Sequence, residues 1–191
     1  SLTDKYFSPI GRGPEVARPE KANVTLDKDR YISYEDNVRF PMIQMVIPTI
    51  PGHHPDEPAL DVLSEILGGG NNSIFYRNFV KSQKAIGASA SHPASELTGK
   101  FVFTVQAIPG KPLAEMEQLI RESIAAFEKQ GISDGDMMRF RAANETRIIN
   151  SMSGIAGKAS LLSSYQTFNG DANHIGKDLE RYAKVTREDI M

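Results

Sequence analysis

The side chains best suited to chemistry in this sequence are its four histidines, His53, His54, His92 and His174. His53 and His54 lie just before Asp56, and imidazole and carboxylate groups are both zinc ligands. Adjacent histidines point in different directions, however, and no third ligand accompanies them at a fixed spacing. No window reads His-x-x-Glu-His or its reverse, and the chain has no cysteine. We therefore expect a solvated turn before a helix here, and we predict no catalytic and no metal-binding residue in this chain.

A run of three glycines and two asparagines, residues 68–72, is the second candidate for chemistry. Backbone N–H groups of a glycine-rich turn can hold a phosphate. A P-loop also needs a strand before it and Gly-Lys-Ser/Thr at the start of the next helix, and neither feature is in the sequence. The run is typical instead of a helix end followed by a hinge, where glycine adopts positive φ at little cost.

The segments on either side of this run have helical spacing. Leu60, Leu63 and Leu67 recur every three or four residues, which places them on one face of a helix. Pro55 or Pro58 suits the first turn of that helix, where a missing N–H costs nothing. After the glycines, apolar and basic residues again recur at helical spacing: Ile74, Phe75, Phe79 and Val80 against Arg77, Lys81 and Lys84. The sequence predicts a helix, a glycine hinge and a second helix.

The same stretch, residues 55–77, resembles the second domain in each half of the pitrilysin/insulinase-type zinc metallopeptidases, the inverzincins that include processing peptidases. Its pattern is Pro-Asp-x-x-Ala-Leu-x-Val-Leu-x-x-Ile-Leu-Gly-Gly-Gly, then Ser, then a Tyr-Arg pair. Five further matches follow the family's order: Lys5-Tyr6-Phe7, Ala85-Ile86-Gly87, Gly99-Lys100-Phe101, Gly131-Ile132-Ser133-Asp134 and Val185-Thr186-Arg187-Glu188-Asp189-Ile190. The resemblance covers nearly the whole chain.

The resemblance implies a non-catalytic part of a larger enzyme. In family members the zinc motif lies in the domain that precedes this type, so zinc is expected in the full-length enzyme and no cofactor in this chain. The implied function is a structural and substrate-enclosing domain of a zinc-dependent metallopeptidase that hydrolyses peptide bonds. The implied partners are an upstream catalytic domain, a second homologous half and a peptide substrate.

The glycine-rich helix pair of this family lies near the enclosed substrate chamber. The resemblance therefore offers five candidates for lining that chamber: Gly69, Gly70, Asn71, Tyr76 and Arg77. The ordinary alternative is that Tyr76 is a core residue and that Arg77 lays its aliphatic stem along the surface.

A second interpretation stays open. Family members stabilise the oxyanion of the reaction with an Arg and a Tyr from the corresponding domain of their second half. Here Lys100 stands at the position expected for that Arg, and no Tyr follows it closely. This departure indicates a domain from the first, zinc-bearing half, or a scaffold homologue without peptidase activity, like the core subunits of respiratory complexes. We expect a bacterial protein, and its compartment stays open between the periplasm and the cytoplasm.

Composition is that of an ordinary globular domain. The chain has 191 residues, of which 40% are hydrophobic and 24% are charged, which is enough to bury a sizeable core. Its 22 basic and 24 acidic side chains give a net charge of −2, and no basic cluster is interleaved with aromatics. Nucleic acid is therefore not expected as a partner. No apolar run approaches the ~18 residues that would cross a bilayer, so no membrane segment is expected either.

The predicted organisation has two parts. Residues 8–29 are rich in proline and glycine and lack periodicity, so residues 1–29 are predicted to be the end of an upstream domain and a linker. Residues 30–191 are predicted to be a single domain, truncated at the C-terminus because Thr186 and Asp189 resemble the start of a helix.

Short runs rich in β-branched and aromatic residues predict strands over residues 30–36 and 42–49. Two more strands are predicted over residues 86–91 and 100–108, and in the second of these the side chains alternate between two faces. Helical spacing predicts helices over about residues 113–129, 134–151 and 156–168, with Ser133 and Asp136 as a capping pair for the second. This order favours a two-layer α+β fold, in which helices cover one face of an antiparallel sheet.

Overall fold

The computed structural model of the protein describes residues 1–17, 19–20 and 24–191. Within the connector predicted over residues 8–29, residues 18 and 21–23 lie outside the described part. The strands are β1 (Met42–Thr49), β2 (Ala85–Ser91) and β3 (Gly99–Ala107). The helices are α1 (Leu2–Phe7), α2 (Glu57–Gly68), the π-helical η1 (Tyr76–Val80), α3 (Leu113–Gln130), α4 (Asp134–Ser151), α5 (Ile155–Asn169), α6 (Ile175–Lys184) and α7 (Arg187–Ile190).

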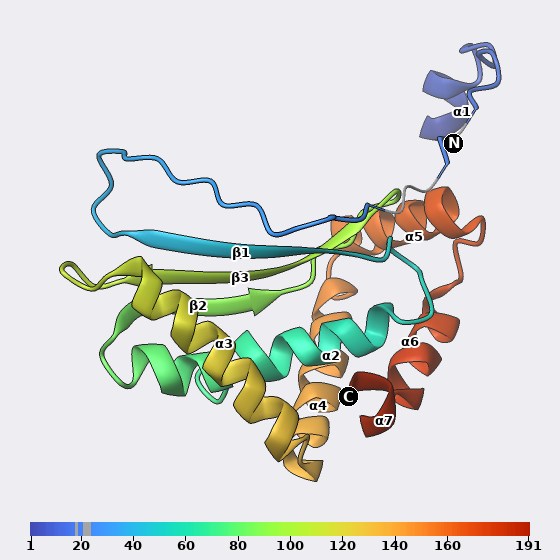
Figure 1. The fold of residues 1–191 in the computed structure, drawn as a ribbon. Helices are drawn as coiled ribbons and strands as arrows, with labels where there is room; N and C mark the ends of the chain where they lie inside the picture. The colour runs from blue at the N-terminus through green and yellow to red at the C-terminus, as the bar shows by residue number, and fades with distance from the viewer. Residues whose placement is uncertain (18, 21–23) are drawn as a thin grey trace.

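The sheet is antiparallel, with strand order β1-β3-β2, so β3 is the central strand. Alternate residues of β3 are buried on the face that α2, η1 and α3 cover, namely Phe101, Phe103, Val105 and Ala107. Phe103 also contacts Phe75, which lies just before η1, at 5.6 Å between ring centroids. Figure 1 shows α2 and α3 below the sheet, α5 beside its right-hand end, and no helix of the described residues lying across the opposite face. The predicted α+β fold, with helices on one face of an antiparallel sheet, is confirmed.

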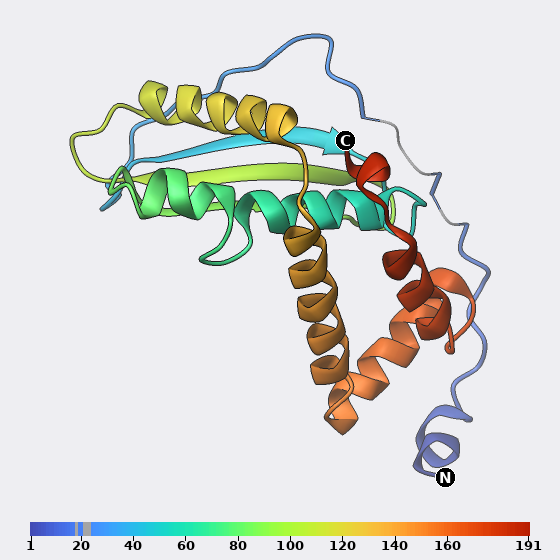
Figure 2. The same ribbon diagram turned by 90° about the horizontal axis from the view of Figure 1, so that it is seen from below.

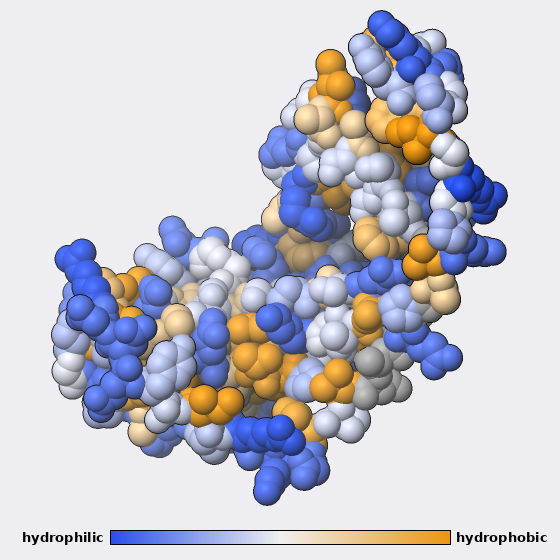
Figure 3. Space-filling model, turned by 90° about the horizontal axis from the view of Figure 1, so that it is seen from above, coloured by the Kyte–Doolittle hydropathy of each residue, from blue (hydrophilic) through white to orange (hydrophobic). Residues whose placement is uncertain are grey.

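The outer face of the sheet is partly apolar. Met42 and Val46 are each exposed by nearly half, at 47% and 48%. Figure 3, which looks onto this side of the molecule, shows apolar patches separated by hydrophilic residues. The alternation of β1 thus sends one set of side chains into the core and the other toward solvent.

The three helices after α3 form an arm beside the sheet. Figure 2 shows α4 leading away from the sheet, α5 returning at an angle to it, and α6 bringing the chain back toward α2. The predicted capping pair is confirmed at the start of α4, because Ser133 and Asp136 form a reciprocal capping box. Thr186 and Asp189 form the same arrangement at α7, also as predicted.

The glycine run ends α2 in the expected way. Gly70 has φ +66°, so the predicted residue with positive φ is confirmed. Gly68 has a different role, since a Cβ atom there would lie 1.8 Å from the backbone nitrogen of Ala90. The end of α2 therefore packs directly on the backbone of β2.

One prediction of secondary structure was wrong, and one helix was missed. Residues 30–36 form no strand, and Tyr31, Ile32 and Tyr34 are 76%, 87% and 83% exposed. β-branched and aromatic residues favour strands by packing on neighbours, and among the described residues no hydrogen-bonded ladder joins this segment to a strand. Helix α6 was not predicted, although Ile175, Leu179 and Tyr182 have the spacing of one helical face.

Candidate functional site

The five predicted chamber-lining residues gather at the turn between α2 and η1. Gly70, Asn71 and Arg77 are exposed, and Gly69 and Tyr76 are half-buried. The guanidinium of Arg77 donates to the backbone oxygen of Asn72 over 2.7 Å, which holds that side chain against the turn. The cavity beside Arg77 measures about 20 Å³, room for one water. The structure therefore brings the five together on one surface turn, and the cavity beside Arg77 is too small for a peptide side chain.

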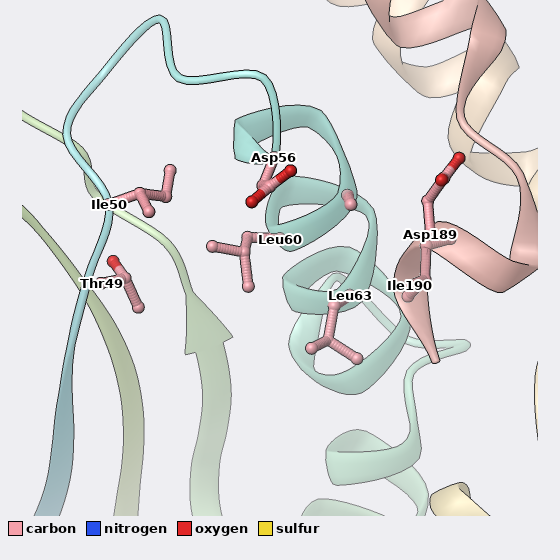
Figure 4. Close-up of a pocket in the computed structure, with 8 residues that line it drawn as sticks. Thr49, Ile50, Asp56, Leu60, Leu63, Asp189 and Ile190 are labelled. Atoms are coloured by element: carbon pink, nitrogen blue, oxygen red, sulfur yellow. The ribbon is translucent and has the colours of Figure 1, made fainter.

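A larger cavity lies at the other end of α2. It has a volume of about 360 Å³ and is lined by Thr49, Ile50, Asp56, Ala59, Leu60, Leu63, Asp189 and Ile190. Figure 4 shows the end of β1, the first turns of α2 and α7 facing one another around it. Sequence reasoning missed this cavity because its walls come from three segments that only the folded chain brings together.

The cavity combines apolar walls with two carboxylates. The backbone N–H and the hydroxyl of Thr186 each donate to Asp189 over 2.8 Å, and they hold the pKa of that carboxyl below its ordinary value. The side chain of Asp56 is 72% exposed, and His54 Nδ1 lies 3.6 Å from its carboxylate. No Lys or Arg is among the described residues that line the cavity. The opening therefore carries a net negative charge at neutral pH.

A buried hydrogen-bond network lies behind Thr49. The side chain of His92 is fully buried, with Nδ1 at 2.9 Å from Asp61 Oδ1 and Nε2 at 3.1 Å from Thr49 Oγ1. The hydroxyl of Tyr182 donates to the other oxygen of Asp61. Burial raises the pKa of Tyr182, and the Asp61 charge adds to the effect. The network ties α2, β1, α6 and the segment after β2 together.

The order Thr49, His92, Asp61 is that of a hydrolytic triad, but the surroundings do not support that chemistry. A triad needs N–H or other donors aimed at the oxygen that becomes negative during the reaction. The cavity in front of Thr49 presents Asp56 and Asp189 instead, and their charges would oppose such an anion. We therefore assign His92 and Asp61 a structural role.

The remaining histidines do not fit the zinc ion that the family resemblance implies for the full-length enzyme. The ring of His53 lies 6.5 Å from those of His174 and Tyr165, centroid to centroid. Across the described ranges, no three His, Cys, Asp or Glu side chains are grouped so that they could hold a metal ion. In the same part of the chain, no helix is both long and apolar enough to cross a membrane.

Comparison with known proteins gives one family. The peptidase M16 inactive domain matches residues 1–144. No curated protein matches the chain.

Solved structures share the fold at low identity. A protease from Helicobacter pylori is 18% identical with a TM-score of 0.81, covering 99% of this chain and 46% of its own. The inactive peptidase domain of a candidate zinc protease from Bordetella parapertussis is 16% identical with a TM-score of 0.70, covering 83% and 86%. A peptidase M16 inactive domain from Pseudomonas fluorescens is 15% identical with a TM-score of 0.66, covering 78% and 35%. The chain thus spans less than half of the Helicobacter pylori protease.

Proposed function

Because the chain belongs to the family of peptidase M16 inactive domains, a non-catalytic part of metallopeptidase-type proteins, we propose that it encloses substrate in a zinc-dependent peptidase. The peptidase is of the pitrilysin/insulinase type, is bacterial, and holds its zinc in an upstream catalytic domain. The family match over residues 1–144 carries this proposal. The structural relatives support it, since one of them is the inactive domain of a candidate zinc protease.

In this proposal the chain supplies chamber wall. The turn between α2 and η1 offers exposed backbone at Gly70 and exposed polar groups at Asn71 and Arg77, with Gly69 and Tyr76 beneath them. Such groups can bond to the backbone of a bound peptide without selecting its sequence. The contact between Arg77 and the oxygen of Asn72 keeps the guanidinium in place before a peptide arrives.

We propose the same domain organisation that the sequence predicts. Residues 1–29 are the end of an upstream domain and a linker, and residues 30–191 are a single domain. Helix α1 buries none of its residues in this chain, and Leu2, Tyr6 and Phe7 are 74%, 61% and 66% exposed. Exposed apolar side chains of this kind suit a contact with another domain. The proposed partners are the upstream catalytic domain and a second homologous half.

Photo-crosslinking in the full-length, zinc-loaded protein tests this function. A benzophenone amino acid in place of Asn71 should crosslink a labelled peptide substrate, and the same amino acid in place of Glu128, exposed on α3, should not. Peptide hydrolysis that a chelator abolishes should accompany the crosslink. If the full-length protein hydrolyses no peptide with zinc present, it is a scaffold homologue. Hydrolysis with equal crosslinking at both positions would refute the chamber assignment alone.

A further inference from the structure

The outer edge of β1 carries unpaired backbone groups. β1 pairs with β3 on one side only. Ala107 donates its N–H to the oxygen of Pro41 over 2.9 Å, and residues that bond to the partner alternate with residues that face away in an antiparallel ladder. The odd-numbered residues of β1 therefore bond to β3, and the even-numbered residues face outward: Met42, Gln44, Val46 and Pro48. Within the described ranges, no backbone hydrogen bond reaches these outward groups from another segment.

The cavity of about 360 Å³ begins where this edge ends, since Thr49 and Ile50 form part of its wall. Pro48 has no N–H, so strand pairing along the edge stops before the cavity. An extended chain paired with the edge as far as Val46 would therefore have its next side chains beside the opening of the cavity. The edge and the cavity form one continuous surface.

The charges at this surface favour a cation. Asp56 and Asp189 line the cavity, and Figure 4 shows the Asp56 carboxylate above Leu60 and the Asp189 carboxylate turned toward the start of α7. The nearby basic side chains are already paired elsewhere. Arg181 bonds to Glu57 and Asp178, and Arg187 bonds to Asp134. The apolar walls formed by Leu60, Leu63 and Ile190 suit the aliphatic stem of a long side chain.

We propose that this surface binds an extended peptide segment that carries a lysine or an arginine. The peptide backbone pairs with the outward groups of Met42, Gln44 and Val46, as in strand addition. The basic side chain enters the cavity, with its stem against Leu60 and Leu63. Its charged end lies beside the exposed carboxylate of Asp56, at the rim of the cavity. The site rests on the proposed function, because the peptide is taken to be a segment of the substrate.

The test uses three fluorescent peptides of alternating valine and threonine that differ at one central residue: lysine, norleucine or glutamate. Fluorescence anisotropy at low salt gives their affinities for the chain. We expect the lysine peptide to bind most tightly and the glutamate peptide most weakly. Exposed ion pairs are worth about 0.2–1 kcal/mol, so Asp56→Asn should weaken binding of the lysine peptide ~1.4- to 5-fold and leave binding of the norleucine peptide unchanged. Asp56 makes no capping bond through its side chain, so this variant keeps its fold.

Two further variants complete the design. Glu128→Gln removes an exposed carboxylate on α3, away from the cavity, and should change no affinity. Val46→Pro removes an outward N–H and keeps the hydrogen bonds between β1 and β3. It should lower the affinity of all three peptides about 3-fold or more.

Equal binding of the lysine and glutamate peptides, or no binding of any, would overturn the site. So would equal losses in Asp56→Asn and Glu128→Gln. If lysine selectivity is lost while residue 71 still crosslinks substrate in the full-length protein, this site fails and the chamber assignment stands. If the chain binds the lysine peptide selectively but residue 71 does not crosslink substrate, the site for a basic peptide stands, and the bound peptide is not a segment of the substrate.

Discussion

Replacing Gly68 by alanine should destabilise the protein more than any other single change in the glycine run. The added Cβ atom would lie 1.8 Å from Ala90 N, 2.7 Å from Ala90 Cα and 2.7 Å from the carbonyl carbon of Ser89. Ordinary contacts begin near 3.4 Å, so α2 must move away from β2 by about 1.6 Å, the difference between 3.4 and 1.8. All three of these atoms are backbone, and no side-chain rotation relieves the overlap.

The expected cost of this shift is about 3 kcal/mol or more, at the upper end of the range for overpacked cores. It also disturbs the packing of Ile66 and Leu67, which are buried on the same helix. For a chain of this size, 3 kcal/mol corresponds to a fall in melting temperature of about 6–12 °C.

The neighbouring glycines are matched controls. Gly70→Ala meets no atom within 4 Å but must keep φ near +66°, which costs about 1–2 kcal/mol. Gly69 has φ −85°, and its added Cβ would meet only the flexible side chain of Glu65. The free energy of unfolding of Gly69→Ala should therefore be within about 1 kcal/mol of that of the parent. Urea unfolding of the three variants gives the order of their losses in stability. A Gly68→Ala midpoint equal to that of the parent would refute the close approach of α2 to β2.

Three further outcomes are expected. His92→Ala should lower the free energy of unfolding by about 2–4 kcal/mol, because it leaves a buried cavity and a polar partner without its hydrogen bond. His54→Ala, in the exposed turn, should lower it far less. Equal urea midpoints for the two variants would contradict the structural role of the His92 network. Burial and Asp61 raise the folded pKa of Tyr182, so the stability it contributes is fully present below pH ~10, the ordinary tyrosine value, and is lost as pH rises above it. In the Tyr182→Phe variant the melting temperature should fall less steeply between about pH 10 and 12 than in the parent. The same pH dependence in both proteins would contradict this contribution of Tyr182. After dialysis against zinc, metal analysis of the chain should find no stoichiometric zinc; tight zinc that His53→Ala removes would reverse this expectation.

Local patterns in the sequence predicted the parts of the fold that depend on neighbouring residues. The helix before the glycines, the positive φ within the run and the capping box at Ser133 all follow from interactions a few residues apart. The strand predicted over residues 30–36 failed because a strand needs a partner, and pairing is not encoded within the segment. The order of the predicted strands and helices favoured the α+β fold class, and the family resemblance agreed with it.

The larger cavity and the buried network could not be predicted, because both depend on contacts between distant segments. Tyr182 and Asp61 are hydrogen-bonded although they lie 121 positions apart in the sequence. The N-terminal part of α2 and α7 are also distant in the sequence and contact each other only in the folded chain. His92 looked like an isolated histidine in the sequence, with no ligand spacing around it. Its partners on β1 and α2 become visible only once the strands are in register.

The separation of the cavity walls has a consequence for synthesis on the ribosome. Leu60 on α2 and Ile190 on α7 are 130 positions apart in the chain (190 − 60). At about 5–20 residues per second, roughly 7–26 s pass between the addition of the first and of the second. During that interval the apolar start of α2 stays uncovered by α6 and α7, which leaves this end of the domain exposed to chaperones and to contacts with other nascent chains.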